Sequence, residues 1–400
     1  MKKYLIIVIV CLIHGSISGQ QVLSDSTTVS IITCGPHQDA VYYAFGHSAV
    51  RVFDRLNGLD YVFNYGIFDF KQANFYLNFA KGNNNYMLAA YEYKYFQQSY
   101  IENNRFLHEQ ELNLTKQQKQ KVFDFLVKNA LPENASYRYD YFYDNCATRV
   151  RDVFVKVLGD DVKFDGSYIT TDYSIRQLTD FYLTEQPWGD LGIDIGLGLP
   201  MDKKATPYEY MFLPAYLESG FDHATIKNGS AFAPMVSTKK IIYESIPEEV
   251  RGLPHPLYVF GVIAFIAIVL CALDFRNQTL STWFDILLFG VSGLIGILLV
   301  ALWLFTDHKA AANNFNIAWA LPTNFIAVWA FIKNPRWLKG YFLFVALLQF
   351  GLLMGWFFLP QQLNMSLIPI VVSLMMRAYI QYVLRNRGVY SKAKIAKDYL

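Results

Sequence analysis

The chain has 400 residues, of which 53% are hydrophobic and 17% charged, and its formal net charge is +2. Soluble domains average about 45–50% apolar and about 25% charged residues, so this composition argues against a disordered or wholly soluble protein. The small net charge provides no basic field for nucleic-acid binding, and four cysteines without a CxxC pair exclude a disulfide scaffold and indicate no zinc site. A membrane protein is expected.

The first 19 residues predict a signal peptide. Lys2 and Lys3 precede an apolar core at Tyr4–Ile13, and Ser18 and Gly19 supply small residues for cleavage. An uncleaved anchor is the alternative. Either arrangement places the segment that follows outside the cytoplasm.

Residues 20–250 are expected to form one exported catalytic domain, and its first part has the pattern of β-strands. Ser30–Cys34 is a short β-like run, and Gly46–Phe53 alternates apolar or small residues with polar ones. The dipeptide Asn57-Gly58 favours a hairpin turn, so Leu59–Phe68 is expected to return antiparallel to the preceding strand.

The turn also predicts the register of this hairpin. A turn centred on Asn57-Gly58 pairs residues whose numbers sum to about 115. His47 and Asn64 then share one face of the sheet, with Asn64 nearer to Arg51.

Two amphipathic helices are predicted next. Thr115–Asn129 begins with a threonine that can form a capping box with Gln118. The second helix has Asp144 or Asn145 as its N-cap and ends at Gly159. Its apolar stripe consists of Cys146, Val150, Val153, Phe154, Val157 and Leu158. The cysteine is therefore expected in the first turn of a buried helix.

The second half carries five apolar runs, each close to the roughly 20 residues that cross about 30 Å of hydrocarbon. They are Leu257–Leu273, Ile286–Phe305, Phe315–Ile332, Tyr341–Leu359 and Met365–Leu384. Basic residues concentrate in alternate loops and in the tail. This distribution predicts a transmembrane domain over 251–388 and a cytoplasmic tail over 389–400, with the preceding domain outside.

Three segments near the membrane allow further predictions. Residues 200–232 could dip into the interface through the sequence MFLPAYL. The polar loop Thr306–Asn316 is expected either to face the exported domain, where it lines a substrate path or docks the domain, or to be an ordinary solvated loop. Arg377, about two turns inside the last span, is explained by snorkelling.

Cys146 and His47 are candidates for nucleophilic catalysis. A cysteine in the first helical turn faces free N–H groups and the positive end of the helix dipole, and both favour the thiolate. A histidine on a nearby strand can then transfer the proton. The alternatives are that Cys146 is a small buried hydrophobe or forms a disulfide with Cys34, and that His47 caps a strand.

Four stretches of the chain resemble the Lnb-type lipoprotein N-acyltransferases of Bacteroidota. They are SIITCGPHQDAVYYAFGHSAVRVFD, VFNYGIFDFKQANFYLNFAKGNNNY, YRYDYFYDNCATRVRD and PMDKKATPYEYMFLPAYL. The resemblance covers roughly residues 30–234 and continues through the five apolar runs. One departure is the turn at residues 36–39, which reads PHQD where the family usually has a Pro-Gly-Asp/Glu-like turn.

The resemblance implies an α+β permuted papain-like domain, related to NlpC/P60 and lecithin:retinol acyltransferase-like enzymes, followed by an all-α bundle of five transmembrane helices. It also implies a cysteine nucleophile and a histidine base, which fall on Cys146 and His47. The third member is expected at Asn64, with Asp69 as the alternative. No cofactor and no metal are expected.

Other candidate residues surround this pair. Asn145 could orient the cysteine or only cap the helix. Arg149 or Arg151 could meet a lipid phosphate, although a solvated or salt-bridged arginine is equally familiar on a helix. Tyr43, like its neighbour Tyr42, could donate a hydrogen bond to an oxyanion or could only pack against other aromatic side chains. Ser48, next to His47, is the last candidate binding residue.

The expected function is transfer of an acyl chain from a phospholipid, through a Cys146 thioester, to the α-amine of a diacylglyceryl-cysteine lipoprotein. The membrane is the third expected partner, nucleic acid is not one, and the expected location is the bacterial inner membrane with the catalytic domain in the periplasm. The alternatives are a membrane-anchored peptidase or amidase of the cell envelope and a non-catalytic membrane scaffold.

Overall fold

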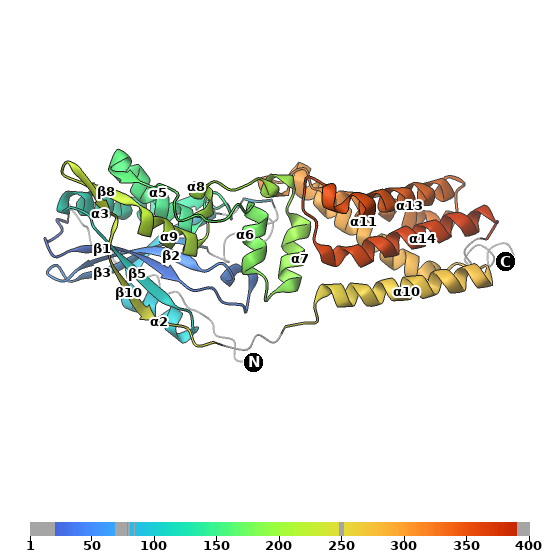
Figure 1. Ribbon diagram of the computed structural model, residues 1–400, viewed down its shortest axis with the longest axis horizontal. Coiled ribbons are helices and arrows are strands. Elements are labelled where there is room, and N and C mark those ends of the chain that lie inside the picture. Colours follow the sequence, from blue (N-terminus) through green and yellow to red (C-terminus); the bar gives the residue numbers. More distant parts are fainter. Residues whose placement is uncertain (1–20, 69–77, 79–80, 84, 248–251, 390–400) are drawn as a thin grey trace.

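The computed structural model describes residues 21–68, 78, 81–83, 85–247 and 252–389, so the predicted signal peptide lies outside the described residues. An N-terminal α+β half and a C-terminal half of long apolar helices lie end to end (Figure 1). Between them lie α6 (Ile175–Tyr182) and α7 (Pro187–Gly196).

A seven-stranded antiparallel sheet is the centre of the N-terminal half, in the order β10-β5-β1-β2-β3-β4-β6. Its strands are β1 Thr28–Cys34, β2 His47–Asp54, β3 Leu59–Ile67, β4 Asn85–Glu92, β5 Leu107–Leu112, β6 Ser136–Arg138 and β10 Val236–Tyr243. A small second sheet contains β7 Val162–Lys163, β8 Thr225–Asn228 and β9 Ala231–Pro234.

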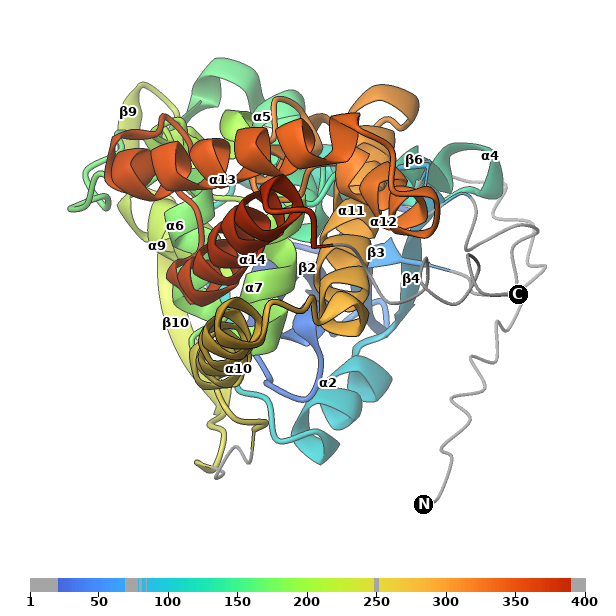
Figure 2. The same ribbon diagram turned by 90° about the vertical axis from the view of Figure 1, so that its right-hand side faces the viewer.

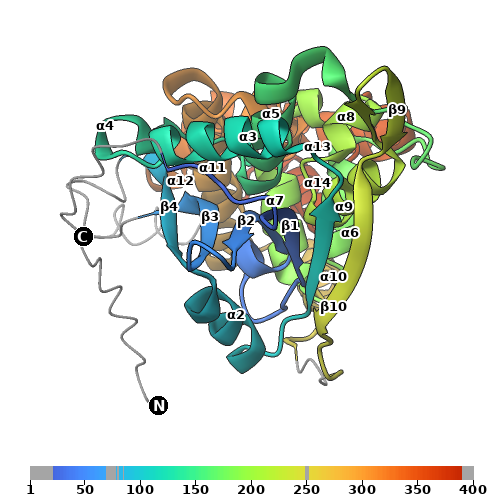
Figure 3. The same ribbon diagram turned by 90° about the vertical axis from the view of Figure 1, so that its left-hand side faces the viewer.

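Helices cover both faces of the large sheet (Figure 3). One face packs on α3 (Lys116–Asn129), α5 (Cys146–Leu158) and α9 (Pro214–His223), and the other face packs on α2 (Tyr93–Glu102). Side chains of β2 alternate between the two, because successive strand residues point to opposite faces. Val50 and Val52 enter the α5 core, whereas Ala49 enters the α2 core. The short helices α4 (Pro132–Ala135) and α8 (Pro207–Tyr210) complete this half.

The two predicted amphipathic helices are confirmed, with their caps. Thr115 and Gln118 form a reciprocal capping box at the start of α3. Asn145, not Asp144, caps α5 and forms a second capping box with Thr148. Gly159 ends α5 with φ of 55°, a backbone conformation that glycine adopts without strain.

The β2–β3 hairpin is confirmed, but its predicted register is wrong by two residues. Arg51 lies opposite Val62, not opposite Asn64. The reason is a longer turn: Asp54 pairs with Leu59 and closes a four-residue loop, and the Asp54 carboxylate accepts a hydrogen bond of 2.7 Å from the Asn57 side chain. A shift of two preserves the faces, so His47 and Asn64 still lie on the same side.

Among the described residues, four helices are long and apolar enough to cross a membrane (Figure 2): α10 Pro256–Asn277, α11 Thr282–Phe305, α13 Trp337–Gly355 and α14 Ile368–Asn386. The predicted third span differs. After the turn of 3₁₀ helix at Phe315–Ala318 and Pro322, α12 (Thr323–Lys333) has 11 residues, or about 17 Å at 1.5 Å per residue. The fifth crossing therefore stays a prediction.

The polar loop Thr306–Asn316 docks the two halves together. The amide nitrogen of Gly198 donates to the carbonyl of Ala310 at 2.7 Å, and the Asn314 side chain donates to the carbonyl of Ile195 at 2.8 Å. Trp188 of α7 stacks edge-on against Phe260 of α10, with ring centroids 5.7 Å apart. Of the two interpretations of this loop, the structure supports docking.

The proposed membrane contact of the MFLPAYL segment is wrong. Its residues Met211, Phe212 and Leu213 are buried in the N-terminal half. They pack there because α8 and α9 fold this segment against α5 and α6. The apolar character of the segment therefore reflects core packing.

Snorkelling of Arg377 is also wrong. Its side chain is fully buried among α10, α11 and α14, and it donates to Asp285 at 2.6 and 2.9 Å and to Asp274 at 2.9 Å. A pair of carboxylates from two other helices neutralises the guanidinium, so it has no need to reach the interface.

Replacing Arg377 with leucine is expected to destabilise the helical half by about 3–5 kcal/mol, because Asp285 would keep a buried charge without its partner. Denaturant unfolding of the detergent-solubilised protein, followed by circular dichroism, measures the loss. The double variant R377L/D285L removes Arg377 together with Asp285 and leaves Asp274 bound to Ser281, so it should recover part of the stability. Equal stability of R377L and the parent protein would contradict a structural role for this ion pair.

Candidate active site

Cys146 is the first residue of α5 and its side chain is buried. Asn145 fixes this end of the helix: its side-chain oxygen accepts from the Thr148 amide at 2.9 Å, and its side-chain nitrogen donates to the carbonyls of Phe212 and Tyr141 at 2.8 and 2.9 Å. Of the two roles considered for Asn145, the structure shows the cap. The thiol consequently has a fixed position at the positive end of the helix dipole.

His47 is the first residue of β2, and Asn64 holds its ring. The Nε2 atom of His47 lies 2.6 Å from Oδ1 of Asn64, and Nδ2 of Asn64 donates to the Tyr91 hydroxyl at 2.8 Å. Cβ of Cys146 and Cε1 of His47 both border the space beside Gly66, so the ring and the thiol lie close together. Because Asn64 occupies Nε2, Nδ1 is the nitrogen left for the sulfur. Cys146, His47 and Asn64 therefore form one connected array.

Gly66 allows the cysteine to reach the histidine. His47 lies on the α2 face of the sheet, whereas α5 covers the opposite face. Where the β3–β4 pairing is irregular, between Asn64 and Ile67, Gly66 has φ of 89°. A Cβ atom there would lie 3.5 Å from Cβ of Cys146 and 3.7 Å from Cε1 of His47. The missing side chain leaves the space in which the two reactive groups meet.

The charges of this pair stabilise each other. Burial by itself raises the pKa of the Cys146 thiol, but the His47 charge, its hydrogen bond and the backbone N–H groups of Ser48 and Ala147 lower the pKa overall. Burial lowers the pKa of His47, and Cys146 and Asn64 more than offset this, so the pKa of His47 is raised. Both shifts favour a thiolate–imidazolium pair, the reactive form of a cysteine nucleophile.

Cys34 lies beside this pair and has a different character. It pairs in register with His47 across β1 and β2 and is completely buried. Burial raises the pKa of its thiol, so the Cys34 thiol stays protonated, whereas the pKa of the Cys146 thiol is lowered. Both cysteines are free, which rules out the disulfide alternative in this structure.

The two arginines that were candidates for a lipid phosphate are both engaged by carboxylates. Arg149 forms a bidentate pair with Asp144, with one distance of 2.6 Å. Arg151 is paired with Asp152 at 2.7 Å and donates to the carbonyl of Tyr208 at 2.8 Å. Each guanidinium therefore already has a carboxylate partner in this arrangement.

The remaining candidates fall in different places. Tyr43 lies over the guanidinium of Arg105, with 5.0 Å from ring centroid to Cζ. The side chain of Ser48 is completely buried, and only its backbone N–H is directed to Cys146. Asp69, the alternative third member, lies outside the described residues.

Aromatic side chains surround the pair, and sequence reasoning did not single them out. The His47 ring stacks with Tyr100 at 6.4 Å between centroids, and Tyr139 approaches from the side of Gly66. Tyr91 and Arg105 were also missed. Tyr91 and Tyr100 come from the consecutive elements β4 and α2, and only the order of the strands in the sheet brings them beside His47.

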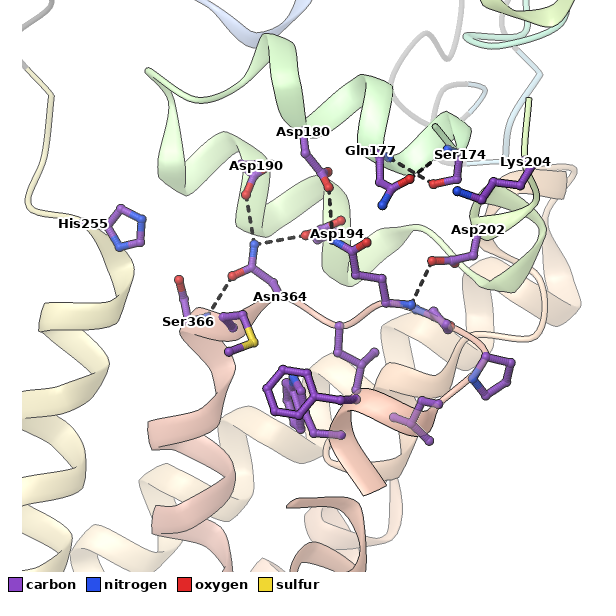
Figure 4. A pocket seen from close by; sticks show the side chains of 18 residues that line it. Ser174, Gln177, Asp180, Asp190, Asp194, Asp202, Lys204, His255, Asn364 and Ser366 are labelled. Carbon is purple, nitrogen blue, oxygen red and sulfur yellow. Dashed lines mark hydrogen bonds between the residues drawn. The ribbon is translucent and has the colours of Figure 1, made fainter. Parts of the chain in front are cut away.

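A cavity lies elsewhere, at the junction of the two halves. It has a volume of about 680 Å³ and contains neither Cys146 nor His47 (Figure 4). Asp180, Asp190 and Asp194 offer oxygens within 4.8 Å of one another. Burial and this mutual repulsion raise the pKa of Asp180 to about 8 and of Asp190 to about 6. Arg176 and Asn364 bind Asp194 and connect the cluster to the segment before α14.

Comparison with known proteins identifies both halves. Residues 19–188 match the family model described as the Lnb N-terminal periplasmic domain, and residues 248–388 match the Lnb transmembrane domain. No curated protein and no solved structure matches the chain. The two matched segments together cover most of the sequence, in the order expected from the resemblance. The chain therefore belongs to the Lnb family, as a membrane protein with an N-terminal periplasmic domain.

Proposed function

We propose that this protein is a lipoprotein N-acyltransferase of the bacterial inner membrane, with Cys146 as nucleophile, His47 as general acid and base, and Asn64 as the residue that orients His47. The observation that carries the proposal is the buried Cys146–His47–Asn64 array at a capped helix start. This arrangement has the elements of a papain-like centre, and the papain-like fold remains part of the proposal.

In the first half-reaction the Cys146 thiolate attacks the carbonyl carbon of a phospholipid ester. A C–S bond forms and the ester C–O bond breaks. The His47 imidazolium gives its proton to the departing glycerol oxygen, so the products are an acyl thioester and a lysophospholipid. The Ser48 and Ala147 N–H groups that now face the sulfur are placed to stabilise negative charge at this centre.

In the second half-reaction the α-amine of a diacylglyceryl-cysteine lipoprotein attacks the thioester. A C–N bond forms and the C–S bond breaks. Neutral His47 takes a proton from the amine, which restores the thiolate–imidazolium pair and completes the cycle. The amide is more stable than the thioester, so this step proceeds downhill.

The position of the array supports a membrane substrate. The loop before β2 contacts the α6–α7 connection, where Gln186 donates to the Gln38 side chain at 2.9 Å. Helix α7 in turn packs through Leu191 into the core of the helical half. The end of the sheet that carries His47 is therefore directed toward the membrane domain, where phospholipid esters lie. We further propose that the C-terminus is cytoplasmic.

Trapping of the acyl-enzyme tests the proposal. Full-length protein in phospholipid vesicles without acceptor should gain the mass of one acyl chain on the peptide that contains Cys146. A synthetic diacylglyceryl-cysteine peptide should then discharge the chain and appear as the N-acylated product. Muropeptides serve as a second substrate. Cleavage of the muropeptides without any acyl adduct on the protein would support the envelope amidase. A protein that reacts with neither phospholipid nor muropeptide would support the scaffold.

A further inference from the structure

Arg105 lies at the same end of the sheet as the Cys146–His47 pair. It lies two residues before the start of β5, and Cys34 of β1 pairs in register both with His47 and with Leu107. Strand β1 lies between β5 and β2, so one strand separates Arg105 from His47. Its positive charge is close enough to lower the pKa of His47, although burial and the Cys146 pair have larger effects on that group.

The guanidinium of Arg105 has an unusual set of partners. Its side chain is only 6% exposed, and Nε donates to the carbonyl of Gly35 at 2.8 Å. Tyr100 and Tyr43 pack on it at 4.6 and 5.0 Å from their ring centroids. Within the described part of the chain, no carboxylate pairs with it and no residue accepts from its two terminal nitrogens.

Three other arginines among the described residues, each largely buried, have the carboxylate that Arg105 lacks. Arg51 pairs with Asp60 and Glu109, Arg176 with Asp194 and Asp202, and Arg377 with Asp274 and Asp285. A buried charge without a counter-ion is costly, so it is retained where a ligand supplies that counter-ion. The terminal nitrogens of Arg105 present an unused pair of donors beside the nucleophile.

We propose that Arg105 binds the phosphodiester of the donor phospholipid and so places its ester carbonyl at Cys146. This inference rests on the proposed acyl transfer. The phosphodiester is the anionic group common to glycerophospholipids, and it lies a few bonds from the esterified glycerol carbons. The planar guanidinium fork suits two phosphate oxygens. Tyr43, which packs on the guanidinium, is 39% exposed, so we place the entry of the headgroup on the side of this ring.

The bound phosphate would also act on the catalytic pair. Without ligand, the charge of Arg105 disfavours the imidazolium form of His47. A phosphodiester anion at Arg105 offsets that charge. Binding of the donor therefore favours the thiolate–imidazolium pair at the moment when it is needed.

The test compares two donors that differ only in the phosphate. Wild-type protein, Arg105→Gln and Arg105→Lys are mixed in neutral detergent with a diacylglycerophosphoethanolamine or with the diacylglycerol of the same chains. Mass spectrometry follows thioester formation on Cys146 in a single turnover. Arg55→Gln is the matched control, because it removes the same charge from an exposed turn of the same domain.

Arg105→Gln is expected to slow acylation from the phospholipid roughly 10- to 100-fold, the range for loss of a charge-assisted hydrogen bond. In the same variant, the rate of acylation from diacylglycerol should change less than about threefold. Arg105→Lys should recover part of the rate with phospholipid. Arg55→Gln should leave the rates with both donors unaltered. Equal loss with both donors would show a purely structural role and overturn the inference, as would no loss with either donor.

Two further arms keep the outcome decisive. If Arg105→Gln does not fold, the wild-type protein alone must prefer the phospholipid over diacylglycerol, and absence of that preference overturns the inference. Inorganic phosphate that blocks both donors equally would identify a site for free phosphate instead and would also overturn it. A wild-type protein that forms no thioester from either donor contradicts the proposed function itself, which is a separate result.

Discussion

Replacing Cys146 with alanine is expected to lower N-acylation by at least about 10⁴-fold, as is typical when the nucleophile of a covalent enzyme is removed. The cap formed by Asn145 and Thr148 does not involve the thiol, so α5 should still form. Loss of one sulfur atom from a site already 8% exposed should cost little stability. Mass spectrometry of lipoprotein N-termini from cells that carry the variant measures the effect.

Cys34→Ala is the matched control for this prediction. Cys34 is buried beside the same strands, but its thiol is neutral and its position fits a packing role. We expect it to retain N-acylation within a few-fold of wild type. Normal N-acylation by Cys146→Ala, with the protein present in the membrane, would eliminate Cys146 as the nucleophile.

His47→Gln is expected to lower the acylation rate by about 10²- to 10⁴-fold, the usual contribution of a general acid–base residue. It should also move the pH dependence of Cys146 in a defined direction. The thiol is held below its ordinary pKa of 9.0 by His47, so without His47 the pH at which iodoacetamide begins to alkylate Cys146 should rise. The alkylation rate as a function of pH measures this shift.

The wild-type pH profile is expected to have two limbs with different causes. Activity falls on the acid side as the thiolate of Cys146 takes up a proton, at a pH below its ordinary pKa. It falls on the alkaline side as His47 loses its proton, at a pH above its ordinary value of 6.5. Asn64→Ala should narrow this window and reduce the rate less than His47→Gln does, because Asn64 supports the raised pKa of His47. An unaltered alkylation profile in His47→Gln would contradict the ion pair.

Local patterns in the sequence predicted local structure well. The capping boxes at Thr115 and Asn145 and the hairpin at Asn57-Gly58 depend on residues within a few positions of one another. The strand period of two also predicted the shared face of His47 and Asn64. The register was missed by two residues, because the Asp54 side chain selects a longer turn than the dipeptide alone suggests.

Features that depend on distant parts of the chain could not be predicted. Arg377 meets Asp285 across 92 positions, and nothing in the last span indicates that partner. Arg105 and Tyr91 reach the candidate site only through the order of strands in the sheet. The arginines near Cys146 in sequence, Arg149 and Arg151, were therefore natural candidates, although each has a local carboxylate.

The attachment of the periplasmic half through α7 and the loop Thr306–Asn316 has a consequence for the choice of acceptor. For the proposed reaction, these contacts would hold Cys146 at one height above the bilayer, in addition to the covalent connection between β10 and α10. A lipid-anchored amine is presented at a fixed height too, whereas the amine of a soluble peptide is diluted through the whole periplasm. The proposed enzyme can therefore distinguish a lipoprotein from a soluble peptide without a pocket for the peptide chain. Enzyme and lipoprotein are anchored in the same membrane, and this raises the effective concentration of the lipoprotein amine alone.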